Sequence, residues 1–156
     1  MINQNQIIEA VCKYLKSQDY PETIPKYTHQ SGIDIEATSS NGSKFYIEAE
    51  GETSSKSTSN RYGKPFDSRQ ALAHVSRVVY KALKIKECKE ATAKVGIALP
   101  LETKHQELIN GIKQILKDLG IVVFWVDNKL KVTIEWLFTQ NCYFIHREDF
   151  LQKGFY

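Results

Sequence analysis

Long apolar runs, a leader-like start and familiar catalytic motifs are all missing from this 156-residue sequence. No run reaches the roughly 18 apolar residues that a membrane-spanning helix needs, so we expect no membrane partner. The first six residues lack the basic and apolar parts of a secretory signal peptide, which favours a cytoplasmic protein. Neither a P-loop nor a Gly-x-Ser-x-Gly pattern is present, so the chemistry has to come from another kind of site.

Cysteine is also scarce, because Cys12, Cys88 and Cys142 stand far apart and no Cys-x-x-Cys pair occurs. Three such cysteines make neither a disulfide framework nor a zinc site on their own. The length predicts one domain over residues 1–156, with a core at about 5–126 and an aromatic-rich C-terminal extension at 127–156. The extension is expected to pack on its own core or to join two copies of the chain in a homodimer.

The net charge of +3 says little about partners, but its distribution says more. Residues 55–90 contain nine Lys and Arg against three Asp and Glu, so this stretch carries +6 and the remainder carries −3. A basic segment beside an acidic one suits a polyanion bound next to a metal site. The alternative is an ordinary charged helix face in contact with water.

Apolar periodicity predicts an α/β protein. Helices are expected near residues 7–15, from Asp67 or Ser68 to Leu83, and from Thr103 to Leu119, and strands at 26–30, 32–38, 44–50, 94–100, 121–126 and 129–136. This order of helix, three strands, helix, strand, helix and two strands implies a mixed β-sheet flanked by helices, with an α-β-β-β-α-β core and an α-β-β extension.

Two alternating runs, at 32–38 and 44–50, form the strongest hairpin signal. If both apolar sets face the core, Ile35 pairs with Ile47, and Ser40, Asn41 and Gly42 form a three-residue loop with glycine in the left-handed position.

The same register places Asp34 opposite Glu48, with Glu36 and Glu50 on the same face of the sheet. Like charges directly opposed across a sheet are destabilising, and a hard cation such as Mg²⁺ or Mn²⁺ relieves the repulsion. The alternative is that this face is merely exposed to solvent.

These residues carry a family resemblance. Asp34 in Gly32-Ile33-Asp34-Ile35, the run Glu48-Ala49-Glu50 on the next strand, and a following helix with Gln70 resemble the PD-(D/E)XK nuclease superfamily. The polar stretches 51–55 and 61–66 resemble its restriction-endonuclease-like, Mrr-type branches. The likeness covers about residues 5–126 and implies a restriction-endonuclease-like fold.

The resemblance implies metal-dependent hydrolysis of phosphodiester bonds in DNA. Asp34, Glu48 and the backbone carbonyl of Ala49 would hold Mg²⁺ or Mn²⁺, and Asp34, Glu48, Glu50 and Gln70 would be the catalytic residues. The family motif ends in lysine where this chain has Glu50, so its cation would come from a migrated lysine: Lys44, Lys56 or Lys64.

A nucleic-acid surface is expected beside these carboxylates. Its members are Lys56, Arg61 and Lys64 in the polar loop, and His74, Arg77 and Lys81 on the following helix. On that helix, Gln70 and His74 are expected nearest the carboxylates, and Arg77 and Lys81 further along. The rival interpretation is a catalytically inactive nuclease-fold module that binds nucleic acid or a protein partner.

Overall fold

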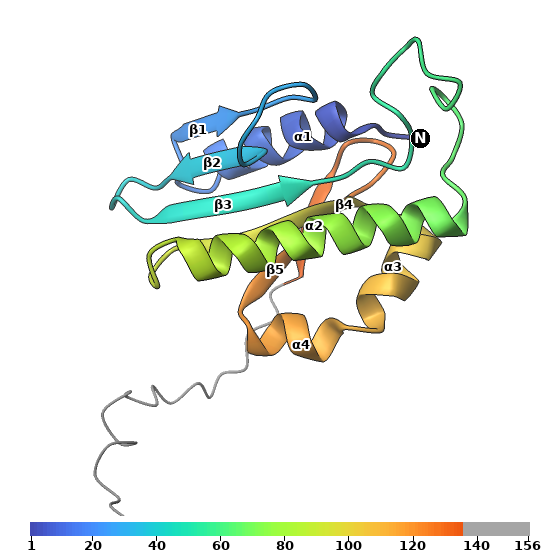
Figure 1. Cartoon of the computed structure of the whole chain (residues 1–156). Coiled ribbons are helices and arrows are strands. Elements are labelled where there is room, and N and C mark those ends of the chain that lie inside the picture. Colours follow the sequence, from blue (N-terminus) through green and yellow to red (C-terminus); the bar gives the residue numbers. More distant parts are fainter. Residues whose placement is uncertain (136–156) are drawn as a thin grey trace, which may run out of the picture.

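A computed structural model describes residues 1–135 as a six-stranded mixed sheet with helices on both faces (Figure 1). The strands lie across the sheet in chain order: β1 (Glu22–Pro25), β2 (Ile35–Thr38), β3 (Lys44–Ala49), β4 (Lys94–Pro100), β5 (Ile121–Val126) and β6 (Val132–Glu135). Strands β3, β4 and β5 are parallel to one another, and the other neighbours are antiparallel. The predicted α/β architecture is therefore confirmed.

Four helices cover the sheet: α1 (Gln4–Lys16), α2 (Ser68–Cys88), α3 (Thr103–Asn110) and α4 (Lys113–Asp118). The apolar stripe of α1 packs on one face, against residues such as Phe45 and Phe124. Helices α2, α3 and α4 cover the opposite face, against residues such as Val95 and Val123. Both long helices begin with a capping box, in which a side chain before the helix and a glutamine three residues later satisfy each other's backbone N–H.

The hairpin has the predicted register. Ile35 pairs with Ile47 and Ala37 with Phe45, and Gly42 has φ of +85° at the end of the three-residue loop. These apolar side chains face α1 and are almost completely buried. Because side chains alternate along a strand, the acidic side chains of β2 and β3 are directed to the face that α2 covers.

Two predicted elements are wrong. The first strand lies at Glu22–Pro25, before the expected 26–30, and it tolerates Pro25 because an edge strand pairs on one side only. The predicted single helix at 103–119 is two short helices, which separate at Gly111 and Ile112. Glycine is a weak helix former, so it is a natural place for this break.

The predicted aromatic extension from Trp136 onward lies outside the described residues. Among residues 1–135, no helix combines the length and apolar character that crossing a membrane requires.

Candidate functional site

Asp34 lies immediately before β2 and connects three parts of the fold. Its Oδ2 accepts a hydrogen bond of 2.9 Å from the backbone N–H of Ala49, at the end of β3. The same oxygen lies 3.3 Å from Nε2 of Gln4, in the first turn of α1. The side chain is buried, so the hairpin and α1 together hold this carboxylate in place.

Glu48 lies on β3, pairs with Ile97 of β4 and is only 3% exposed. Its carboxylate faces α2, where Nζ of Lys81 donates a hydrogen bond of 2.6 Å to Oε2. Burial, and after it the negative charge of Asp34, raises the pKa of Glu48 from 4.5 to about 7, although Lys81 acts in the opposite direction. The pair Asp34–Glu48 therefore has the mutual repulsion that the sequence predicts, and it is inside the protein instead of on an exposed face.

Lys81 is the lysine that is hydrogen-bonded to Glu48. Burial alone would lower the pKa of Lys81, but the hydrogen bond to Glu48 and the charges of Asp34, Glu48 and Glu50 raise it above the usual value. The ammonium form is therefore the one present at neutral pH, and its positive charge lies among three acidic side chains.

Glu50 follows β3 and is turned toward a different part of α2. Its Oε2 lies 2.7 Å from Nδ1 of His74, and its Oε1 accepts a bond of 3.2 Å from Arg77. The ring of His74 also stacks on Phe66, with 4.3 Å between the centroids. Both carboxylate oxygens of Glu50 are thus bound by side chains of α2. Within residues 1–135, no group of three His, Cys, Asp or Glu side chains is arranged to hold a metal ion.

The antiparallel course of α2 over β3 explains these pairings. His74, Arg77 and Lys81 are spaced by three and four residues, so they lie along one face of the helix. Glu48 and Glu50 are two residues apart and share a face of β3. Lys81, the later residue on the helix, bonds to Glu48, the earlier residue on the strand, and Arg77 bonds to Glu50. This reversed order is expected because α2 returns the chain between the parallel strands β3 and β4 and so runs antiparallel to them.

Gln70 caps α2, and within residues 1–135 its side chain makes no hydrogen bond to Asp34, Glu48 or Glu50. Its Oε1 accepts a hydrogen bond from the backbone N–H of Asp67, while Asp67 accepts one from the N–H of Gln70. The expected order along α2 is thus right for His74, which contacts Glu50, but Arg77 and Lys81 reach the carboxylates as well. Gln70 caps the helix instead. The sequence contained a signal for the cap, because aspartate followed three residues later by glutamine is a capping-box pattern.

Within residues 1–135, none of the three lysines considered for the migrated position is bonded to Asp34, Glu48 or Glu50. Lys44 is at the opposite end of β3 from Glu50 and donates a hydrogen bond to Thr38. Lys56 and Lys64 are exposed in the loop that follows β3. Sequence reasoning assigned Lys81 to phosphate contact and missed its place beside Glu48, because only the packing of α2 brings the two together.

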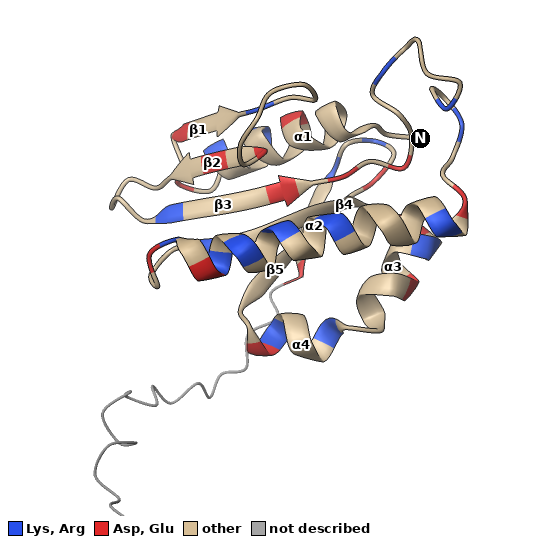
Figure 2. Cartoon of the chain, in the orientation of Figure 1, with Lys and Arg blue, Asp and Glu red and all other residues tan. Residues whose placement is uncertain are grey.

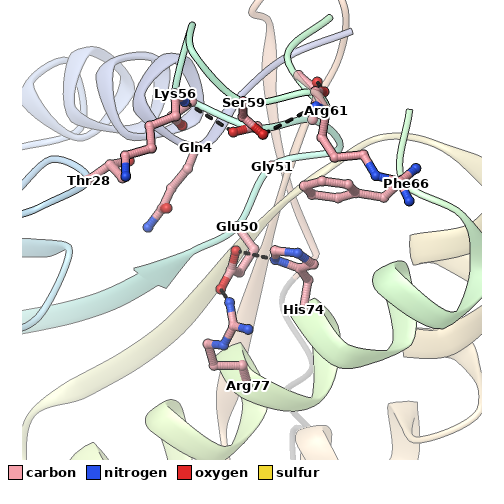
Figure 3. A pocket seen from close by; sticks show the side chains of 13 residues that line it. Gln4, Thr28, Glu50, Gly51, Lys56, Ser59, Arg61, Phe66, His74 and Arg77 are labelled. Atoms are coloured by element: carbon pink, nitrogen blue, oxygen red, sulfur yellow. Dashed lines mark hydrogen bonds and ion pairs between the residues drawn. The ribbon is translucent and has the colours of Figure 1, made fainter. Parts of the chain in front are cut away.

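A cavity of about 300 Å³, which we call the loop pocket, adjoins Glu50 (Figure 3). Glu50, His74 and Arg77 line it on the side of α2, and Lys56 and Arg61 line it from the loop above. Basic residues also follow one another along α2, opposite the acidic end of β3 (Figure 2). The predicted nucleic-acid residues therefore gather around the candidate site, except Lys64, which does not line the pocket.

The Asp34–Glu48 pair fits a small hard cation by the chemistry of its donors. Mg²⁺ in proteins is commonly held by one or two carboxylates, with water and substrate phosphate completing its shell. Two neighbouring buried carboxylates meet that requirement, and a divalent ion would relieve their repulsion. The backbone of Ala49 is adjacent through its bond to Asp34.

Comparisons with known proteins give little further guidance. No family model matches the chain, and no curated protein matches it. One solved structure, an XisH family protein from Nostoc punctiforme, is 14% identical and aligns with a TM-score of 0.42 over 83% of this chain and 98% of that chain. The chemistry of the site therefore has to be inferred from the residues of this chain.

Proposed function

We propose that this chain is a metal-dependent nuclease that hydrolyses phosphodiester bonds in DNA. The observation that supports this function best is the buried Asp34–Glu48 pair, with the Lys81 ammonium bonded to Glu48 at 2.6 Å. Two carboxylates and one cation are the parts that metal-assisted phosphoryl hydrolysis requires.

The carboxylates would hold Mg²⁺ or Mn²⁺ together with the backbone carbonyl of Ala49. When bound, such an ion supplies Lewis-acid polarisation of a phosphoryl oxygen and lowers the pKa of a water molecule. Asp34 keeps its orientation through the hydrogen bonds from Ala49 and Gln4, so the protein fixes one of the two ligands before any ion binds.

Lys81 supplies the positive charge that the nuclease motif has in its lysine, at the position where this chain has Glu50. Because its pKa is raised, Lys81 stays protonated at neutral pH and acts as a positive charge, not as a base. It offsets the negative charge that develops on the phosphoryl group. Glu50 has a positioning role, since it holds His74 and Arg77 toward the surface where the DNA backbone would lie.

The test is cleavage of supercoiled plasmid and of single-stranded circular DNA in Mg²⁺ and in Mn²⁺. We expect Asp34→Ala to abolish cleavage and Lys81→Met to lower its rate by about 100-fold or more. Lys84→Met is the matched control, because Lys84 is an exposed lysine on the same helix, and it should cleave like the unmodified chain. Equal loss in the two lysine variants would contradict the role of Lys81.

One observation favours a second function, an inactive nuclease-fold module that binds DNA. The nuclease motif that the chain resembles has a lysine where this chain has Glu50, and the Glu50 carboxylate is already bound by two side chains of α2. Binding of DNA without cleavage in either metal would support this module and overturn the nuclease. Cleavage that Asp34→Ala abolishes would exclude it.

A further inference from the structure

The loop pocket is connected to the candidate metal ligands through shared side chains. Gln4 lines the pocket and also approaches Asp34, at 3.3 Å between Nε2 and Oδ2. Glu50 lines the pocket and is two residues from Glu48 on the same strand end. A ligand in the pocket would therefore contact Gln4 and Glu50, the two lining residues that adjoin the Asp34–Glu48 pair.

The charge of the pocket suits an anion. Arg77 and His74 are already bonded to Glu50, but the ammonium of Lys56 and the guanidinium of Arg61 have no side-chain partner within residues 1–135. In Figure 3 both side chains descend from the loop, that of Lys56 toward Thr28 and that of Arg61 alongside Phe66, so they line different sides of the pocket. Serine and threonine hydroxyls supply further polar groups in the wall. Two uncommitted cations among hydroxyls are a typical environment for a phosphate ester.

The size of the pocket limits what enters it. A volume of about 300 Å³ is at the lower end for small-molecule sites, which suits one nucleotide and not a base pair. A nucleotide that enters such a pocket has to leave the stacked duplex, and this costs least when the strand is already single.

We propose that the loop pocket binds one unpaired nucleotide of a DNA strand, with phosphates of the strand on Lys56 at one side of the pocket and on Arg61 at the other. The pocket thereby directs the strand to the neighbouring carboxylates and gives the protein a preference for single-stranded DNA or for strand ends opened out of a duplex. The placement of cleavage beside the pocket rests on the proposed function, whereas the binding itself does not.

The experiment measures binding without metal, so it is independent of cleavage. Fluorescence anisotropy in EDTA compares a labelled single-stranded oligonucleotide with the same sequence as a duplex. The test variant is Lys56→Ala/Arg61→Ala, and Lys129→Ala/Lys131→Ala removes the same charge from an exposed turn that is not part of the pocket. We expect the test variant to lose at least tenfold in single-strand affinity and to lower the salt slope by about 1.4 for two lost phosphate contacts.

Duplex affinity should fall by no more than about threefold in the same variant, and the turn variant should leave both affinities nearly unchanged. Lys56→Arg/Arg61→Lys keeps both charges and should restore single-strand binding. Deoxythymidine monophosphate should displace the oligonucleotide at lower concentration than inorganic phosphate. Equal loss for single strand and duplex, no loss in the test variant, or equal competition by phosphate alone would each overturn the proposal. An inactive chain that still shows the single-strand loss would reject the nuclease and leave the pocket assigned.

Discussion

Replacing Glu48 by glutamine removes a buried carboxylate whose pKa burial, and then the charge of Asp34, raises from 4.5 to about 7. Below pH 4.5 this group is protonated in both the folded and the unfolded chain, so its ionisation does not lower the free energy of unfolding. As the pH rises from 4.5 to about 7, the unfolded chain releases the proton while the folded chain keeps it. The folded chain then binds more protons, so its free energy of unfolding falls with rising pH.

The rise in the pKa corresponds to about 3 kcal/mol of unfolding free energy, which is lost in full above pH 7. We therefore expect the difference in unfolding free energy, unmodified chain minus Glu48→Gln, to fall by about 3 kcal/mol between pH 4.5 and pH 8. Lys81 does not alter this trend, because its pKa is raised above 10.5 and the amine stays charged throughout that range.

The assay is urea unfolding followed by circular dichroism at five pH values from 4.5 to 8.5, for both chains at the same salt concentration. Taking the difference between the two chains removes the contribution of all other titrating groups that the substitution leaves unchanged. A difference that is flat, or that rises with pH, would refute the reasoning. It would mean that the bond from Lys81 outweighs burial and the repulsion from Asp34.

Three further predictions concern the metal, the helix cap and the pocket. Mg²⁺ at ten times its dissociation constant should stabilise the unmodified chain at pH 8 by about 1.4 kcal/mol, and calorimetric titration of Asp34→Asn should detect no Mg²⁺ binding. Gln70→Ala should lower the unfolding free energy by about 1 kcal/mol while leaving the rate of DNA cleavage within about twofold, because this amide caps α2; a cleavage loss of 100-fold would restore the catalytic role. Gly51→Ala should lower the melting temperature and cost about 1–3 kcal/mol, because its new Cβ would lie 2.6 Å from the backbone nitrogen of Gln4; an unchanged melting temperature would contradict the close approach.

The sequence by itself determined the hairpin and the acidic pair. Apolar residues alternate along 32–38 and 44–50, and only one register buries both sets. That register, confirmed at Ile35 and Ile47, brings Asp34 and Glu48 to neighbouring strand ends. Side chains of a strand alternate between its two faces, so the apolar alternation indicates which face is buried. For a hairpin with a short loop, it also indicates which residues of the two strands pair.

Only the tertiary structure decided which cation serves the carboxylates. The periodicity of α2 shows that His74, Arg77 and Lys81 share a face, but it contains no information on how far the helix lies along β3. A shift by one helical turn, about 5.4 Å, would move Lys81 away from Glu48. The position of the helix depends on the length of loop 51–66, the cap at Asp67 and the packing of its apolar face on β3 and β4. These are contacts between residues far apart in the chain, and they exist only once the whole sheet has formed.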